Sequence, residues 1–167
     1  MGKIANADIL KKITEKFSDH VTVVGEPFGL LTLETSRENL IGVLTWLKNE
    51  PVLQFGFLTD ITAIHFPEAE KSIGVIYHLH SLLNNVRVRI KVFLEIDDVH
   101  VPTATVLWNG ANWMERETYD FFGVIFDGHP DLRRILNVDD MVAFPMRKEH
   151  PLEDPNRVDK KDYFFGR

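Results

Sequence analysis

Two stretches within the first fifty residues repeat apolar side chains at intervals of three and four, which predicts two helices with one buried face each. The first spans residues 6–19, and Asn6 is a residue type that caps a helix start. Thr35 and Glu38 have the spacing of a capping box for the second helix, which ends before Pro51. The apolar stripes are Ile9, Leu10, Ile13 and Phe17 in the first helix and Leu40, Val43, Leu44 and Leu47 in the second.

Short apolar and alternating runs predict strands on both sides of the second helix. Residues 21–24 and 30–33 are two short strands, because glycines and a proline interrupt the chain between them. Residues 53–66 also have the character of a strand, but the alternation changes frame near Thr59 and Asp60, which predicts a bulge.

A β-hairpin is predicted around Asn84-Asn85, a pair that tolerates the positive φ of a two-residue turn. Residues 73–83 and 86–96 alternate on either side of it, with an apolar face and a polar face. The predicted pairs are Tyr77–Val92, Val75–Leu94 and Leu79–Ile90 on the apolar face and His80–Arg89 and His78–Lys91 on the polar face. Two imidazoles on one face suit a metal ion, but the cations opposite disfavour one, which favours a solvated or partner-facing surface.

Beyond residue 100, the pattern predicts two short helical pieces. They span residues 103–108 and 113–122. Asn112 is placed to cap the second piece, and Gly123 suits its C-terminal end.

The composition of the chain mainly excludes classes of function. The chain has 167 residues, a net charge of −6 and no cysteine, so thiolate catalysis, cysteine-ligated zinc and a self-contained iron–sulfur cluster are ruled out. No Gly-x-Gly occurs, which leaves neither a dinucleotide fingerprint nor a phosphate-binding loop. No apolar run approaches the roughly 18 residues that span a bilayer, and the acidic balance argues against nucleic acid as a partner. We therefore expect a soluble, cytosolic domain without a cofactor of its own.

A dense charged cluster allows two interpretations. Its members are Glu115, Arg116, Glu117, Asp120, His129, Asp131, Arg133 and Arg134. The acids and the histidine would suit an acid/base or metal site. The alternative is an ion-pair network, in which Arg116 pairs with Asp120 one helical turn away. The network is favoured because the charges nearly balance and no nucleophile stands beside a base.

The order of motifs in the second half resembles one family. The central runs are Glu115-Arg116-Glu117, Asp120-Phe121-Phe122-Gly123 and Gly128-His129-Pro130-Asp131-Leu132-Arg133-Arg134-Ile135-Leu136. The resemblance extends upstream through Asp60, Thr62-Ala63, Tyr77-His78-Leu79, Val101-Pro102, Leu107-Trp108 and Ala111-Asn112-Trp113, and downstream through Pro145, Arg147-Lys148 and Pro151-Leu152. Over about residues 60–152 the sequence resembles the C subunit of the bacterial NADH:quinone oxidoreductase, the 30 kDa subunit family of respiratory complex I. Family members usually have Gly-His where this chain has Ala143-Phe144, and Asp where it has Glu149.

The resemblance implies that this chain has a structural role and catalyses no reaction itself. The family's 30 kDa subunit binds no flavin and no iron–sulfur cluster; FMN, iron–sulfur clusters, NADH and quinone belong to partner subunits. It packs beside the D subunit, which forms the quinone pocket, on the cytoplasmic side of the bacterial cell membrane, and it meets the membrane only through the complex. We therefore expect a non-catalytic scaffold that stabilises the quinone-reducing module of a proton-translocating NADH dehydrogenase.

Two alternatives stay open. The same scaffold could serve a membrane-bound hydrogenase-type complex, which a pull-down would reveal. A stand-alone metallohydrolase using Glu117, His129 and Asp131 would carry metal after purification.

The expected architecture is α+β. A two-layer α/β domain with a mixed β-sheet spans residues 1–100, a short helical motif segment spans 101–144, and an extended tail spans 145–167. Eleven of the 23 tail residues are charged, so the tail cannot recover its ordering entropy alone and is expected to extend along a partner. Tyr163, Phe164 and Phe165 are the expected anchor, and the arginines of the motif are expected to act in docking or local ion pairing.

Overall fold

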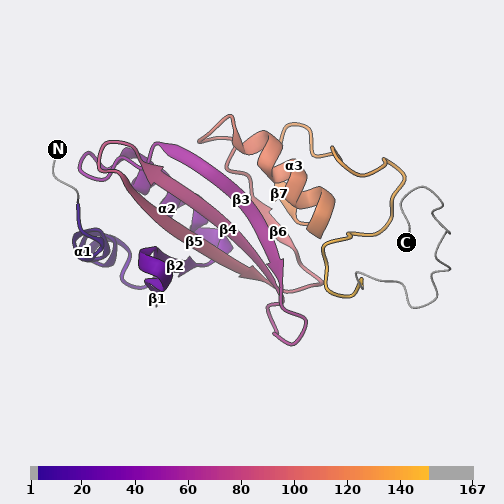
Figure 1. The fold of residues 1–167 in the computed structure, drawn as a ribbon, viewed down its shortest axis with the longest axis horizontal. Helices are drawn as coiled ribbons and strands as arrows, with labels where there is room; N and C mark the ends of the chain where they lie inside the picture. The colour runs from indigo at the N-terminus through magenta and orange to yellow at the C-terminus, as the bar shows by residue number, and fades with distance from the viewer. Residues whose placement is uncertain (1–3, 151–167) are drawn as a thin grey trace, which may run out of the picture.

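The structure, a computed structural model, describes residues 4–150, which form three helices and two sheets (Figure 1). The elements are α1 (Asn6–Phe17), β1 (Val21–Gly25), the 3₁₀ turn η1 (Pro27–Gly29), β2 (Leu31–Thr35), α2 (Arg37–Asn49), β3 (Phe57–His65), β4 (Ile73–Ser81), β5 (Val86–Leu94), β6 (His100–Pro102), α3 (Ala111–Phe122) and β7 (Ile125–Asp127). The prediction of a short helix over residues 103–108 is wrong. There the chain only turns, with the amides of Leu107 and Trp108 both donating to the Ala104 carbonyl.

The main sheet has five strands in the order β1-β2-β5-β4-β3 and is mixed, because β2 and β5 run parallel while the other neighbours are antiparallel. This arrangement confirms the α+β class. The predicted bulge is also confirmed, as a register shift between Leu58 and Asp60. A separate two-stranded parallel sheet joins β6 to β7.

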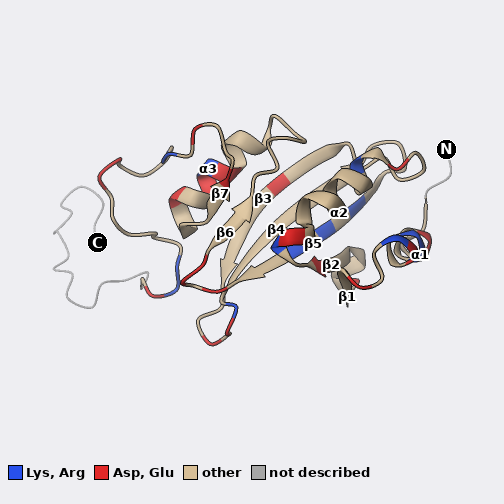
Figure 2. Ribbon diagram, turned by 180° about the vertical axis from the view of Figure 1, so that it is seen from behind, with Lys and Arg blue, Asp and Glu red and all other residues tan. Residues whose placement is uncertain are grey.

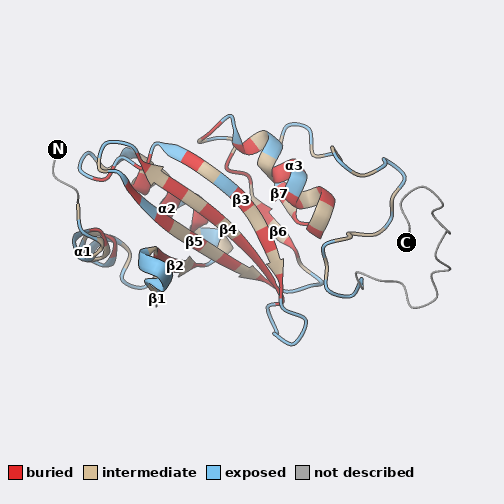
Figure 3. Cartoon of the chain, viewed as in Figure 1, coloured by how far each residue is buried: buried red, intermediate tan, exposed pale blue. Residues whose placement is uncertain are grey.

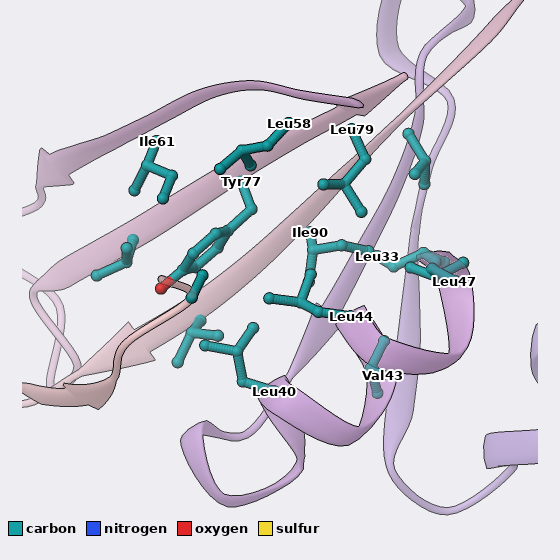
Figure 4. Packing of buried hydrophobic residues seen from close by; sticks show 14 of the residues in the cluster. Leu33, Leu40, Val43, Leu44, Leu47, Leu58, Ile61, Tyr77, Leu79 and Ile90 are labelled. Carbon is teal, nitrogen blue, oxygen red and sulfur yellow. The ribbon is translucent and has the colours of Figure 1, made fainter. Parts of the chain in front are cut away.

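One face of the main sheet is covered and the other is open. Figure 1 views the open face with α2 behind it, and Figure 2 shows α2 in front after the half-turn. The fully buried side chains of α2 are the predicted Leu40, Val43, Leu44 and Leu47. Figure 4 shows them beside Leu33, Tyr77 and Ile90 of the strands. Buried and partly exposed residues alternate along β4 and β5 (Figure 3), as a sheet with one wet face requires.

The β4–β5 hairpin differs from the predicted register by two residues. Ser81 pairs with Val86, so the connecting loop has four residues rather than two. The observed pairs are Tyr77–Ile90, Val75–Val92, Leu79–Val88, His80–Arg87 and His78–Arg89. Only Asn85 has positive φ, while the Asn84 side chain donates to the Val52 carbonyl at 2.8 Å and lies outside a two-residue turn. A shift of two leaves every side chain on its predicted face.

Three predicted helix caps are wrong, because each predicted capping residue lies one or two positions away from the N-cap of its helix. Asn6 lies inside α1, where its side chain donates to the Glu26 carboxylate at 3.0 Å. Thr35 is the last residue of β2, and its hydroxyl donates to the carbonyl of His20 at 2.7 Å. The N-cap of α2 is the next residue, Ser36. Asn112 is likewise the second residue of α3. None of the helices within residues 4–150 combines the length and apolar character needed to cross a membrane.

Candidate functional site

A carboxyl group of α3 is buried in the core. Glu115 has no exposed surface, and its two oxygens accept hydrogen bonds from the Thr103 hydroxyl and the Ala104 amide, each at 2.6 Å. Burial raises the pKa of Glu115 to about 7, although both hydrogen bonds act in the opposite direction. Glu115 forms no ion pair within residues 4–150, and it instead fastens α3 to the loop after β6.

A second acidic group of α3 collects five hydrogen-bond donors. Asp120 Oδ2 accepts the backbone amides of Ile135 (3.1 Å), Leu136 (2.8 Å) and Asn137 (2.9 Å). Oδ1 accepts the Asn137 side-chain amide at 3.0 Å and Arg134 Nη1 at 2.7 Å. Burial alone would raise the pKa of Asp120, but the hydrogen bonds from Asn137, Leu136 and Arg134 outweigh it and hold that pKa well below its ordinary range.

Arg134 holds a stretch of chain that lacks regular structure. Its side chain is 8% exposed and forms a buried ion pair with Asp120. The other guanidinium nitrogen, Nη2, donates to the carbonyls of Met141 (2.6 Å) and Ala143 (3.1 Å). Arg134 thus serves local ion pairing inside the chain, and it ties residues 134–143 to the C-terminal half of α3.

The predicted Arg116–Asp120 pair is wrong. Arg116 points its guanidinium at the backbone and donates to the carbonyls of Arg133 (3.1 Å) and Arg134 (3.2 Å). The same group lies 4.9 Å from the ring centre of Trp113, which is itself exposed. Two arginine side chains therefore fix the chain around residue 134 to α3. Arg116 of α3 donates to its backbone carbonyls, and Arg134 pairs with the Asp120 carboxylate of α3.

Gly123 ends α3 as predicted, with φ of 76° in the left-handed region. A Cβ at this position would come within 2.6 Å of the Phe144 ring and 2.7 Å of Arg147 Nη2. Arg147 Nε donates to the Phe122 carbonyl at 2.7 Å, and its guanidinium lies 4.8 Å from the centre of the Phe144 ring, with that of Arg134 at 5.1 Å. The glycine is required here for both its backbone conformation and the close approach of the ring.

Comparison with known proteins places the chain in a family. The model of one family, the respiratory-chain NADH dehydrogenase 30 Kd subunit, matches residues 33–156. This chain belongs to that family. Proteins named as the C subunit of NADH-quinone oxidoreductase, from Citrifermentans bemidjiense and Brucella ovis, are each 41% identical to it, over 87% and 91% of this chain and 89% and 75% of their own lengths.

Solved structures share the fold of this 30 kDa subunit family member. The trypsin-resistant fragment of Nqo5 aligns with a TM-score of 0.63 at 30% identity, covering 75% of this chain and 98% of the fragment. A chain of an archaeal membrane-bound sulfane sulfur reductase aligns with a TM-score of 0.74 over 93% of this chain and 96% of its own length. Its 23% identity shows a common fold alone.

The remaining motif residues of this 30 kDa family member lie nearer the surface. His129 Nε2 lies 3.1 Å from the Asn112 carbonyl oxygen, and His129 Nδ1 accepts the Asp131 amide at 3.0 Å. Arg133 pairs with Asp131 at 2.9 Å, with both side chains largely exposed. Within residues 4–150 no group of three or more acidic or histidine side chains could hold a metal, so Glu117, His129 and Asp131 do not assemble the site of the metallohydrolase alternative.

The other predicted positions divide between turns, core and surface. Gly128 has φ of 83°, Pro130 is exposed, and Leu132 packs partly against the core. The backbone amide of Lys148 donates to His65 Nδ1 at 3.0 Å, which joins this part of the chain to β3. Tyr163, Phe164 and Phe165 lie outside the described residues.

Residues 128–150, called the C-terminal segment below, have no helix or strand, yet their backbone is held at many points. The segment turns several large apolar side chains to solvent. These are Leu136, Val138, Val142 and Met146. Apolar side chains exposed on a fixed backbone offer a partner protein surface whose burial removes those side chains from water.

Proposed function

We propose that this chain is the 30 kDa subunit of a bacterial NADH:quinone oxidoreductase, where it acts as a scaffold that stabilises the quinone-reducing module. The observation that carries the proposal is the C-terminal segment, which α3 holds in one shape and which exposes apolar side chains. Burial of those side chains by a partner is favourable because it removes them from water. The family assignment supports a partner within the respiratory complex.

In this proposal the buried groups of α3 position the segment and take no part in chemistry. Asp120 and Arg134 fix its first half, and Arg147 with Phe144 fixes its second half. The proposed partner is the D subunit, which forms the quinone pocket, on the cytoplasmic side of the cell membrane. FMN, iron–sulfur clusters, NADH and quinone are held by other subunits, consistent with a chain that has no cysteine.

A second candidate is the same scaffold in a membrane-bound hydrogenase-type complex. It is favoured by one observation, the fold shared with a chain of the sulfane sulfur reductase complex over 93% of this chain. A pull-down of the tagged chain from detergent-solubilised membranes distinguishes the two, because mass spectrometry identifies the co-purifying subunits. Recovery of flavin and iron–sulfur subunits of an NADH dehydrogenase supports the first candidate.

The docking role is tested by placing a charge at Val142, which is 92% exposed. We expect Val142→Asp to leave the melting temperature of the isolated chain unchanged while it depletes assembled complex on native gels and lowers NADH:quinone turnover in proportion. Val106→Asp is the matched control, since Val106 is also exposed but lies in the turn after β6. Full assembly of the Val142→Asp complex would refute docking through the C-terminal segment.

The non-catalytic role is tested on the purified full chain. We expect it to be colourless and unable to oxidise NADH, because the sequence offers neither thiolate ligands nor a dinucleotide fingerprint. A stoichiometric visible chromophore in the isolated chain would contradict this part of the proposal.

A further inference from the structure

The open face of the main sheet carries a row of cations on its inner strand β5. Arg87, Arg89 and Lys91 alternate with buried residues along β5 and so project from this face together. Within residues 4–150 none of the three forms an ion pair with a carboxylate. The row gathers three cations although the chain as a whole has a net charge of −6. In the sheet register Glu34 of β2 lies opposite Lys91, whereas Thr32 lies opposite Arg89.

Histidines of β4 extend this row without neutralising it. Arg89 Nε donates to His78 Nε2 at 3.0 Å, which places the imidazole proton on Nδ1, 3.7 Å from an Asp60 oxygen. Burial and the adjacent Arg89 lower the pKa of His78, so the ring is neutral near pH 7 and accepts from the arginine. Asp60 on β3 and Glu34 on β2 are the carboxylates that flank the row, one on each side.

One end of the row opens into a hollow of about 1040 Å³. It is lined by His80, Arg87 and Arg89, by the start of α1, by η1 and by the carboxylate of Glu26, which accepts a hydrogen bond from the Asn6 side chain. Phe28 of η1 is fully exposed and has φ of 58°, a left-handed conformation that is unfavourable for a residue other than glycine. Exposed aromatic and arginine side chains around a hollow are the residue types that dominate binding at protein interfaces.

We propose that this face, here called the basic face, docks a carboxylate-rich surface of another protein, separately from the C-terminal segment. Charge complementarity selects the class of partner. Carboxylates of a protein can pair with Arg87, Arg89 and Lys91, while its basic side chains can meet Asp60 and Glu34. A nucleic acid or an anionic membrane presents only negative charge and would be repelled by both flanking carboxylates. Phe28 would insert into the partner beside the hollow.

The direct test is zero-length carbodiimide cross-linking of the purified assembled complex, since this reagent joins a lysine amine to a carboxylate in contact with it. We expect mass spectrometry to find Lys91 linked to an Asp or Glu of another subunit. We also expect Lys91 to be protected from acetylation in the complex and reactive in the free chain. A link only to Glu34 of the same chain, or equal acetylation in both states, overturns the proposal.

Charge reversal supplies the functional test. Arg87→Glu with Lys91→Glu should retain the melting temperature of the free chain and reduce assembled complex about tenfold. The control, Lys11→Glu with Lys16→Glu, makes the same charge change on exposed positions of α1. Normal assembly of the double variant at the basic face overturns the inference, and the proposed scaffold role stands if Val142→Asp still blocks assembly.

The class of partner is tested with vesicles and heparin. The purified chain should bind neither phosphatidylserine vesicles nor heparin at physiological salt. Binding that Arg87→Glu with Lys91→Glu abolishes would assign the basic face to a lipid or nucleic-acid polyanion and overturn the protein partner.

Discussion

Replacement of Glu115 by glutamine removes the one buried carboxyl group that lacks a cationic partner within residues 4–150. The side chain has no exposed surface and contacts Thr103 and Ala104 through hydrogen bonds of 2.6 Å. Glutamine keeps the shape and can still accept the Ala104 amide. The substitution therefore changes the titration of the site while leaving its packing in place.

The magnitude follows from the pKa. Burial raises the pKa of Glu115 from an ordinary 4.5 to about 7. One pKa unit corresponds to about 1.4 kcal/mol, so the ionised side chain lowers the free energy of unfolding by about 3 kcal/mol. Because the pKa is raised in the folded state, the folded chain binds the proton more tightly than the unfolded chain. The contribution of this group to stability is then highest below pH 4.5, falls as the pH rises toward 7, and is constant above it.

The assay is urea denaturation of the wild-type chain and of Glu115→Gln between about pH 4.5 and 8. We expect the stability of the variant relative to wild type to rise by about 3 kcal/mol across this range. The difference between the two chains cancels the opposite contribution of His78, whose lowered pKa favours the folded state at higher pH. Parallel pH profiles would refute the reasoning, because they would mean that Glu115 ionises in the fold as readily as in the unfolded chain.

Four further substitutions test α3, the chain that surrounds it and the neighbouring strand β4. Asp120→Asn should lower the free energy of unfolding by about 3–5 kcal/mol in thermal or urea melts, because it leaves Arg134 buried without its counter-charge; a loss below about 1 kcal/mol would contradict this. Gly128→Ala should lower the free energy of unfolding by about 1 kcal/mol, because of its positive φ alone. Gly123→Ala should lower it by about 1–3 kcal/mol more, because the added methyl group meets the Phe144 ring. Equal losses for the two variants would show that the ring moves freely. Tyr77→Phe should be neutral or stabilising by about 1 kcal/mol, since the buried hydroxyl has no hydrogen-bond partner within residues 4–150, and a clear destabilisation would reveal a partner for it.

The periodic parts of the chain can be predicted because burial repeats along them. The stripe from Leu40 to Leu47 and the alternation along β4 and β5 each depend on local spacing, and both are as expected. The predicted hairpin register is wrong because the Asn84 side chain is used by a distant carbonyl, that of Val52. A sequence pattern sets which face a side chain occupies, whereas the exact partner depends on tertiary contacts.

The motif residues show the same division. Sequence spacing suggests that Arg116 pairs with Asp120 along the helix, but each has partners in the C-terminal segment instead. Those partners are mostly backbone groups, which no residue pattern distinguishes. Phe144 lies far from Gly123 along the chain, yet its ring covers that glycine. Nothing in the sequence points from this aromatic residue to the glycine beneath it.

The way in which the C-terminal segment is fastened has a consequence for how the chain opens and how it associates. The amides of Ile135, Leu136 and Asn137 share Asp120 as acceptor, so they should exchange with deuterium together while the β4–β5 ladder stays protected. The segment is thus a cooperative unit of its own, separate from the sheet. Because folding has already ordered this unit, a partner that binds it meets a preorganised surface, and little conformational entropy is lost at that step.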